Sequence, residues 1–81
     1  MRWPKLILRK RYKIEWHDFT GVVNQRLSDA TPAPCWSEGL LVRDEPDYLV
    51  LASSQYRGEG DNPTGDYTCL IKGACVSCKR L

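Results

Sequence analysis

Apolar and charged residues alternate near the start of the chain in the pattern of a half-buried β-strand. Over residues 6–16 the apolar side chains share one parity and most charged side chains share the other. The apolar positions are Leu6, Leu8, Tyr12, Ile14 and Trp16, and the charged positions are Arg9, Arg11, Lys13 and Glu15. Because successive side chains of a strand point to opposite faces, this pattern predicts one buried and one charged face. Lys10 interrupts the apolar parity, which indicates a bulge or a strand start near it.

Four further short strands follow from the distribution of apolar runs and turn residues. We expect them over residues 36–43, 48–54, 67–72 and 74–81. The acids and the proline of residues 44–47 suit a tight polar turn, which makes the second and third strands a hairpin. Gly73 separates the last two strands, as expected for a strand pair that turns a corner.

Two segments with several glycine, proline and polar residues are predicted to be loops. Residues 17–34 form the longer one, with one helical turn at about residues 22–27, and residues 55–66 form an exposed loop. Five short strands with so little helix predict an all-β fold. We expect a small five-stranded SH3-like or Sm-like barrel with a long irregular segment after the first strand. A chain of 81 residues has room for one such domain, spanning residues 1–81.

No stretch of the sequence is apolar for long enough to span a bilayer or to form the core of a secretory signal. The longest uncharged apolar runs are residues 6–8 and 48–52. We therefore expect a cytoplasmic protein with no membrane partner.

Positive charge is concentrated at the two ends of the chain, although the formal net charge is only +2. Residues 1–13 and 72–80 hold all but three of the 12 lysines and arginines, whereas all 10 acids lie within residues 15–66. If the two terminal strands lie side by side, these cations form one basic face. The first strand contributes Arg9, Lys10, Arg11 and Lys13 to it. Such a face favours binding of DNA or RNA, although the acidic central part of the chain weakens that case.

Four cysteines raise the question of disulfides or zinc. They are Cys35, Cys69, Cys75 and Cys78. The expected compartment is reducing, so we expect free thiols that pack as small apolar groups. Zinc needs four converging ligands, and only Cys75 and Cys78 have the C-x-x-C spacing. Their segment is also predicted to be a strand, which points the two thiols to opposite faces. Zinc held by all four cysteines is the weaker alternative, and we expect no cofactor.

Two tryptophans and a carboxylate are the candidates for a ligand cleft. Large aromatic side chains are usually buried, so Trp16 and Trp36 are first expected to pack the core or to close the barrel ends. In the alternative, both rings stack on a base, Asp18 accepts hydrogen bonds from its edge, and a strand end binds phosphate. The residues at that strand end are Ser53, Ser54 and Arg57. A nucleophile–base pair would have to use His17, the only histidine, and nothing in the local sequence assembles one, so we expect no catalytic residues.

Four segments resemble motifs of small uncharacterised phage-encoded proteins. They are Ile14-Glu15-Trp16-His17-Asp18, Gly39-Leu40-Leu41-Val42, Tyr48-Leu49-Val50-Leu51-Ala52-Ser53-Ser54 and Ile71-Lys72-Gly73-Ala74-Cys75-Val76. Those proteins carry a W-x-D motif, a G-[FWL]-L-V strand, an [IL]-x-L-A-S-x strand and a final I-P-[KR]-x-x-I segment. Here Leu70-Ile71-Lys72 lacks the proline of the last motif. The resemblance implies a compact β-barrel encoded by a phage accessory gene, without catalytic activity.

Three functions follow from these features. In the first, a phage accessory protein sequesters a small nucleotide-like ligand, such as an immune signal of the bacterial host, and so acts against host defence. A homo-oligomer would help this function, because a small barrel has little concave surface and subunit interfaces can enclose a pocket. In the second, the basic face binds DNA or RNA. In the third, the barrel docks on a host protein and inhibits it.

Overall fold

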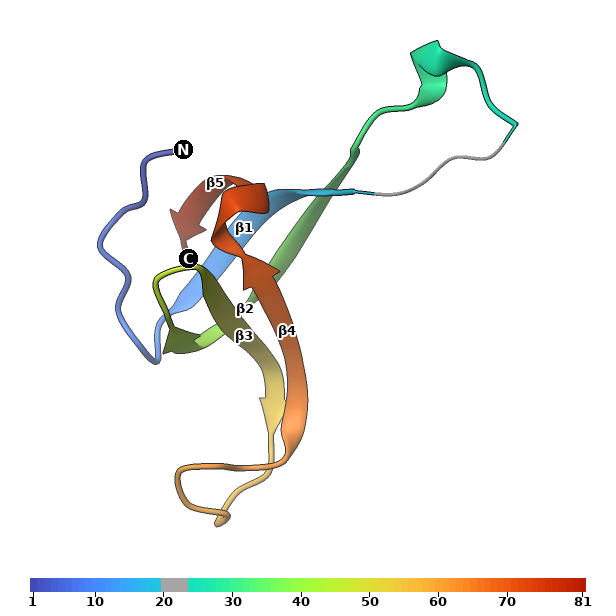
Figure 1. Cartoon of the computed structure of the whole chain (residues 1–81). Coiled ribbons are helices and arrows are strands. Elements are labelled where there is room, and N and C mark those ends of the chain that lie inside the picture. Colours follow the sequence, from blue (N-terminus) through green and yellow to red (C-terminus); the bar gives the residue numbers. More distant parts are fainter. Residues whose placement is uncertain (20–23) are drawn as a thin grey trace.

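Five antiparallel strands form one sheet in this protein. The computed structural model describes residues 1–19 and 24–81. Its elements are β1 (Arg11–Asp18), the 3-10 turn η1 (Leu27–Asp29), β2 (Ala33–Asp44), β3 (Tyr48–Gln55), β4 (Gly65–Ile71), the 3-10 turn η2 (Lys72–Ala74) and β5 (Cys75–Arg80). The strand order is β4-β3-β2-β1-β5, so β4 and β5 are the two edges, and η2 connects them (Figure 1). The expected all-β fold is confirmed; among the described residues no ladder joins β4 to β5 and closes the sheet.

β1 begins at Arg11 rather than at Leu6 because the chain turns immediately before it. Arg9 has a positive φ of 70°, and its N–H donates to the Leu41 carbonyl oxygen at 2.8 Å. The Leu41 N–H in turn donates to the Lys10 carbonyl oxygen at 2.9 Å. This turn confirms the strand start predicted near Lys10.

The hairpin of β1 and β2 is longer than predicted. β1 continues to Asp18 and β2 starts at Ala33, and these two residues pair with each other. The predicted helical turn at residues 22–27 falls partly on residues 20–23, which lie outside the described residues, and η1 follows at its end. The predicted turn at residues 44–47 and the corner at Gly73 are both confirmed. None of the described helical segments is long and apolar enough to cross a membrane.

The core lies on one face of the sheet. Its fully buried side chains are Tyr12, Ile14, Leu41, Leu49 and Leu51, and Leu70 and Cys75 complete the cluster. The predicted alternation is confirmed within β1, where Tyr12 and Ile14 are buried whereas Arg11 and Glu15 are exposed, but it is wrong for Leu8, which is exposed because it precedes the strand. Full burial of each large apolar side chain contributes roughly 1.5–3 kcal/mol to stability. We call the opposite side of the sheet the outer face.

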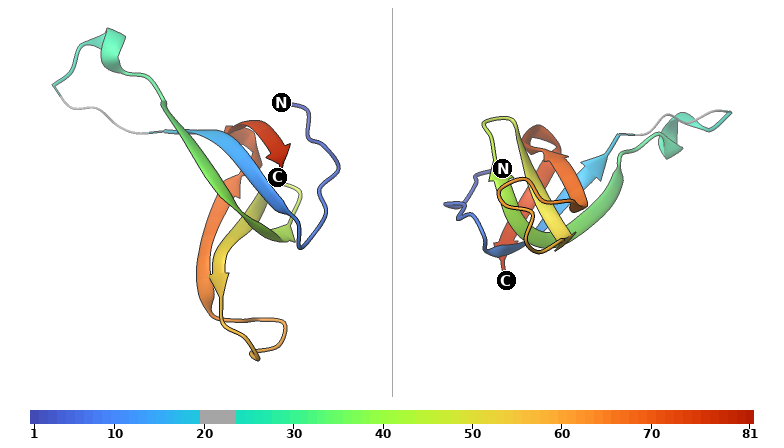
Figure 2. Two further views of the ribbon diagram at one scale, coloured as in Figure 1. Left: turned by 180° about the vertical axis from the view of Figure 1, so that it is seen from behind. Right: turned by 90° about the horizontal axis from the view of Figure 1, so that it is seen from below.

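The N-terminal segment, residues 1–10, packs on the core instead of extending β1. Trp3 and Leu6 contact the core cluster. The Ile7 N–H donates to the Tyr12 hydroxyl oxygen at 2.9 Å, and the Lys72 ammonium lies 5.7 Å from the centre of the Trp3 ring. In both views of Figure 2 this segment runs beside the sheet as an extended chain. Leu6, which was predicted to lie in the first strand, is therefore half-buried in a segment that packs on the core without pairing as a strand.

The far end of the β1–β2 hairpin projects from the rest of the protein as an arm (Figures 1 and 2). The ladder between β1 and β5 stops at Trp16, so beyond that residue the hairpin has no third strand. The radius of gyration is 15.0 Å, whereas a compact chain of this length has about 12 Å. Phe19, directly after β1, leaves 72 % of its surface exposed. The arm therefore makes the molecule elongated and carries an exposed aromatic side chain.

β2 and β3 approach each other closely at Gly39, and this contact can be tested. A Cβ atom at position 39 would lie 2.9 Å from the Ala52 carbonyl oxygen and 3.0 Å from Leu51 Cβ. We expect Gly39→Ala to lower the free energy of unfolding by about 1–3 kcal/mol, because the backbone has to shift to admit the methyl group. Gly73→Ala is the control, since a Cβ at that position meets no atom within 4 Å. Equal urea denaturation curves for the two variants would contradict the close approach.

Candidate functional site

The two candidate tryptophans lie on opposite faces of the sheet. Trp16 pairs with Cys35, and this pair faces the core. Trp36 pairs with Glu15, one position further along, so its ring lies on the outer face and is 60 % exposed. The Trp16 indole N–H donates to Ser37 Oγ at 3.1 Å. Both tryptophans border one shallow hollow of about 160 Å³, but their rings do not share a face on which a base could stack between them.

The remaining members of the predicted cleft are also separated. Asp18 is half-buried at the start of the arm, beside a hollow of about 210 Å³. Ser54 Oγ donates to Asp66 Oδ2 at 2.8 Å, and Ser53 Oγ donates to the Asp66 carbonyl oxygen at 3.4 Å. These two hydroxyls therefore tie β3 to β4. Arg57 lies elsewhere, in the loop between β3 and β4.

The predicted basic face is interrupted by carboxylates. β1 and β5 do pair, with Lys13 opposite Lys79, so the expected adjacency of the terminal strands is confirmed. However, Glu38 stands opposite Lys13 on the other side, and Glu15 follows on the same face. Arg9 is directed toward β3 instead, where its guanidinium donates a hydrogen bond. The cations of β1 therefore alternate with carboxylates on this surface and do not form a continuous positive stripe.

The four cysteines are free and do not gather around one point. Cys35 is half-buried on β2, Cys69 is exposed on β4, and Cys75 lies in the core. Within the described part of the chain, no group of three His, Cys, Asp or Glu side chains could hold a metal ion. Cys75 and Cys78 were expected on opposite faces, but a bulge at Val76 turns both toward the core. Burial raises the pKa of both thiols, as expected for cysteines that pack as apolar groups.

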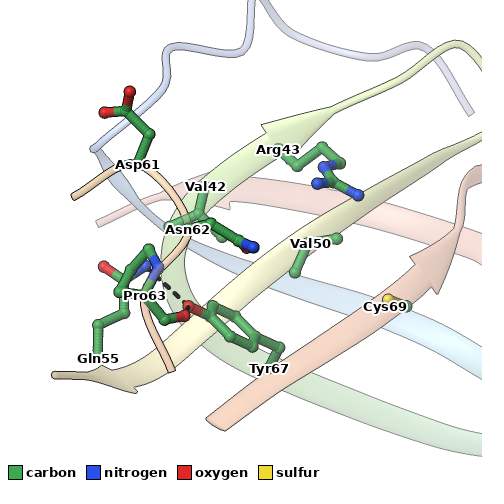
Figure 3. A pocket seen from close by; sticks show the side chains of 9 residues that line it. All are labelled: Val42, Arg43, Val50, Gln55, Asp61, Asn62, Pro63, Tyr67 and Cys69. Carbon is green, nitrogen blue, oxygen red and sulfur yellow. Dashed lines mark hydrogen bonds between the residues drawn. The ribbon is translucent and has the colours of Figure 1, made fainter. Parts of the chain in front are cut away.

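A groove on the outer face gathers more arginines than the other hollows of the described residues and is the candidate site. One part has a volume of about 260 Å³ and adjoins a second part of about 530 Å³, because the two share four lining residues. The first part is lined by Val42, Arg43, Val50, Gln55, Asp61, Asn62, Pro63, Tyr67 and Cys69 (Figure 3). The second adds Arg9, Tyr56, Arg57, Gly58 and Gly60. The shared members are Val42, Gln55, Asp61 and Pro63.

The floor of the groove comes from the outer face of β2, β3 and β4. Val50 pairs with Arg43 on one side and with Cys69 on the other, so these three side chains share that face. The ladder of β2 and β3 shifts register between Leu41 and Arg43, which places Val42 in a bulge at the groove. Bulges commonly redirect side chains next to binding sites.

The wall of the groove is the loop of residues 56–64, which is anchored to the sheet. The Tyr67 hydroxyl donates to the Pro63 carbonyl oxygen at 2.6 Å and accepts a hydrogen bond from Gln55 Nε2 at 3.2 Å. Gln55 Oε1 accepts from the Arg9 guanidinium at 3.1 Å. Positive φ values at Gly58 and Gly60 allow the turns within the loop. In Figure 3 the loop lies along one side of the groove, with Asn62 directed across it.

Three guanidinium groups give the groove its electrostatic character. Arg43 lines the first part, and Arg9 and Arg57 line the second. The neighbouring Tyr48 side chain raises the pKa of Arg43, so this group stays cationic. In the described residues the ion pair of Lys72 and Asp44 does not involve any of the three arginines, and none of them makes another. They are therefore free to bind an anion, with Arg9 already oriented by Gln55.

The anchoring role of Tyr67 leads to a second prediction. In Tyr67→Phe the hydroxyl no longer holds Pro63 and Gln55. We expect roughly fivefold faster hydrogen exchange at the Tyr56 amide, which donates to the Thr64 carbonyl oxygen at the base of the loop. Tyr56→Phe is the control, because the Tyr56 hydroxyl makes no hydrogen bond within the described residues. Unchanged exchange in Tyr67→Phe would mean that the anchor does not order the loop.

Of the predicted candidates, the groove contains Arg57 and Arg9, which the sequence had placed in two different sites. It does not contain Trp16, Asp18 or Trp36. Sequence reasoning missed Arg43 and Tyr67, although both stand in predicted strands.

No known protein family, curated protein or solved structure matches the chain significantly.

Proposed function

We propose that this protein is a non-enzymatic binding protein that holds a small anionic ligand with a planar ring, of the nucleotide type, in the groove. The observation that carries this proposal is the presence, in one concave surface beside an aromatic ring, of three guanidiniums that form no ion pair with the described residues. Guanidinium groups bind phosphate through paired, charge-assisted hydrogen bonds. Tyr67 offers a partly exposed ring, and Asn62 and Gln55 offer amide groups for the polar edge of a base.

The size of the groove agrees with a ligand of this class. Ligand sites usually have volumes of about 300–1,000 Å³, and the two parts of the groove measure about 260 and 530 Å³. Asp61 is the one carboxylate among the groove residues, and it can accept hydrogen bonds from a sugar or a base amino group. Both parts are open to solvent, so we expect moderate affinity unless a second chain covers the ligand.

The biological setting of the proposal comes from the sequence motifs. The resemblance to phage-encoded proteins supports a phage accessory protein in the bacterial cytoplasm, and the ligand would then be a nucleotide-type immune signal of the host. The strand order and the helical turn between β4 and β5 support an SH3-like or Sm-like barrel. A protein that sequesters its ligand needs a recognition surface but no reactive groups.

The test combines native mass spectrometry with calorimetry. Protein purified gently from bacteria is expected to retain a mass of a few hundred daltons. In calorimetry with adenosine monophosphate, adenosine and inorganic phosphate as probes, we expect the nucleotide to bind more tightly than either of its parts, because ring and phosphate contact different groups. If the protein retains no such mass and binds none of the three probes, the proposal is wrong.

Nucleic-acid binding is a second candidate, favoured by one contact on the outer face. The Lys13 ammonium lies 4.7 Å from the centre of the exposed Trp36 ring. Lys79 pairs with Lys13, and Arg11 lies two residues before Lys13 on the same face of β1. An exposed aromatic ring beside cations can stack on a base of a single strand. Affinity for an oligonucleotide should then fall steeply with salt, whereas the affinity for a mononucleotide in the groove should fall less, because it carries fewer phosphates.

A further inference from the structure

The outward edge of β4 carries backbone groups that the sheet leaves free. In an antiparallel ladder, successive residues alternate between bonding to the neighbouring strand and pointing away from it. The Lys72 N–H donates to the Asp47 carbonyl oxygen, and the Tyr56 N–H donates to the Thr64 carbonyl oxygen. In both bonds the residue next to β4 is even-numbered, so the even-numbered residues of β4 direct their N–H and C=O groups to β3. The odd-numbered residues therefore direct their N–H and C=O groups outward: Tyr67, Cys69 and Ile71.

The edge of β4 lacks the features that usually prevent strands from pairing with another chain. Natural edge strands are protected by lysine, proline or a bulge. β5, at the opposite edge, has a bulge at Val76 and the cations Lys79 and Arg80. β4 has seven residues with no proline, no lysine and no bulge after Asp66. The edge at β5 thus has protecting features that the edge at β4 lacks, so β4 is the edge suited to pair with a further strand.

The sequence of β4 is complementary to itself in one antiparallel register. With a twofold axis at Cys69, Tyr67 of one chain stands opposite Ile71 of the other, and Cys69 stands opposite its own copy. Tyr67 and Ile71 are 42 % and 63 % exposed, and aromatic side chains opposite β-branched ones stabilise antiparallel pairs. The Ile71 carbonyl oxygen already accepts a hydrogen bond from the Cys75 thiol at 3.3 Å, so Ile71 contributes chiefly its N–H.

We propose that the protein forms a symmetric dimer in which β4 pairs antiparallel with β4 of a second copy, with Cys69 on the twofold axis. Beside the end of this edge is a hollow of about 210 Å³ that Trp16 and Phe19 border, and within the described part of the chain no strand pairs with the outward edge of β4. Tyr67 and Cys69 also line the groove, so the second copy borders each groove and covers part of it. The pairing does not depend on the ligand proposed above.

Cys69 provides a direct test of the register. Residues opposite each other in a bonded antiparallel pair have Cα atoms about 5.5 Å apart, within the range that a disulfide spans. Diamide, as oxidant, accepts two electrons and two protons from the two thiols as the S–S bond forms. We expect light scattering to give the mass of two chains, and we expect diamide to yield a covalent dimer whose peptide mass map joins Cys69 to Cys69. Cys69→Ser should remain dimeric but should not cross-link.

A charge on the edge should separate the chains without unfolding them. In Ile71→Lys, an exposed apolar side chain is replaced by the residue that protects natural edges, so we expect a folded monomer by light scattering and circular dichroism. Val76→Lys, at an exposed position on the other edge, is the control and should stay dimeric. A wild-type monomer at all soluble concentrations would overturn the proposal. So would an assembly larger than two chains, since that requires β4 to pair with a different strand. A ligand can still bind to the groove in either of these cases, so the proposed function is judged separately.

Discussion

Leu41→Ala is expected to lower the free energy of unfolding by about 3 kcal/mol, the largest loss of stability among the variants considered. Leu41 is fully buried between β1 and β3, opposite Leu51. Its backbone also bonds to both sides of the turn at Arg9 and Lys10, so the residue joins the core to the start of β1. A chain of 81 residues has a stability of roughly 4–12 kcal/mol, so the loss is a large part of the total.

The neighbouring leucine supplies a matched control for this prediction. Leu40 stands one position earlier on β2, points to the outer face and is only half-buried. We expect Leu40→Ala to lower the free energy of unfolding clearly less than Leu41→Ala does, because less buried surface is lost and no closed cavity remains. Urea denaturation followed by tryptophan fluorescence gives both values. If the two variants are equally destabilised, the assignment of the core to one face of the sheet is wrong.

The parity of residues along each strand could be predicted from the sequence, but the relation between strands could not. Alternation identified Tyr12 and Ile14 as buried, because that period is a local property. Whether Trp16 and Trp36 share a face depends on the register of β1 and β2, and a shift of one residue reverses the answer. That register is set by the long hairpin of β1 and β2. Its length could not be predicted, because the glycine, proline and polar residues of 17–34 indicated a loop.

Bulges explain why the sequence predicted the wrong face for some side chains. The spacing of Cys75 and Cys78 predicts opposite faces for a regular strand, but one extra residue at Val76 brings both thiols to the core side. A bulge at Val42 similarly changes which side chains of β2 reach the groove. Irregularities of this kind arise from the twist and curvature of the whole sheet, so no local pattern in the sequence indicates them.

The candidate site was predicted only in part, for a related reason. Arg57 could be selected because a cation in a glycine-containing loop next to a strand end suits an anion site. Arg9, Arg43 and Tyr67 come from three different parts of the chain, and the pairing of β2, β3 and β4 together with the contacts of Arg9 to β2 and β3 brings them to one groove. Their proximity depends on the tertiary structure, so no local pattern in the sequence indicates it. One signal in the sequence was the presence of Arg43 among the acids of residues 38–47.

Reversing two charges in the groove should produce the largest change in ligand binding. In the double variant Arg43→Glu with Arg57→Glu, each part of the groove loses a guanidinium and gains a carboxylate. We expect the affinity for adenosine monophosphate to fall by roughly a hundredfold or more, because each charge-assisted hydrogen bond contributes about tenfold and the new carboxylates repel the phosphate. Both residues are exposed, so the fold should tolerate the change.

The control for this double variant must change the net charge by the same amount. Arg2→Glu with Arg26→Glu does so at two exposed positions that do not line the groove. Long-range attraction of an anion depends on net charge and is weakened by salt, whereas direct contact with a guanidinium depends on position. If calorimetry gives the same loss of affinity for both double variants, and the loss disappears at high salt, the groove does not bind the phosphate. A loss confined to Arg43→Glu with Arg57→Glu, and retained at high salt, places the phosphate beside these two residues.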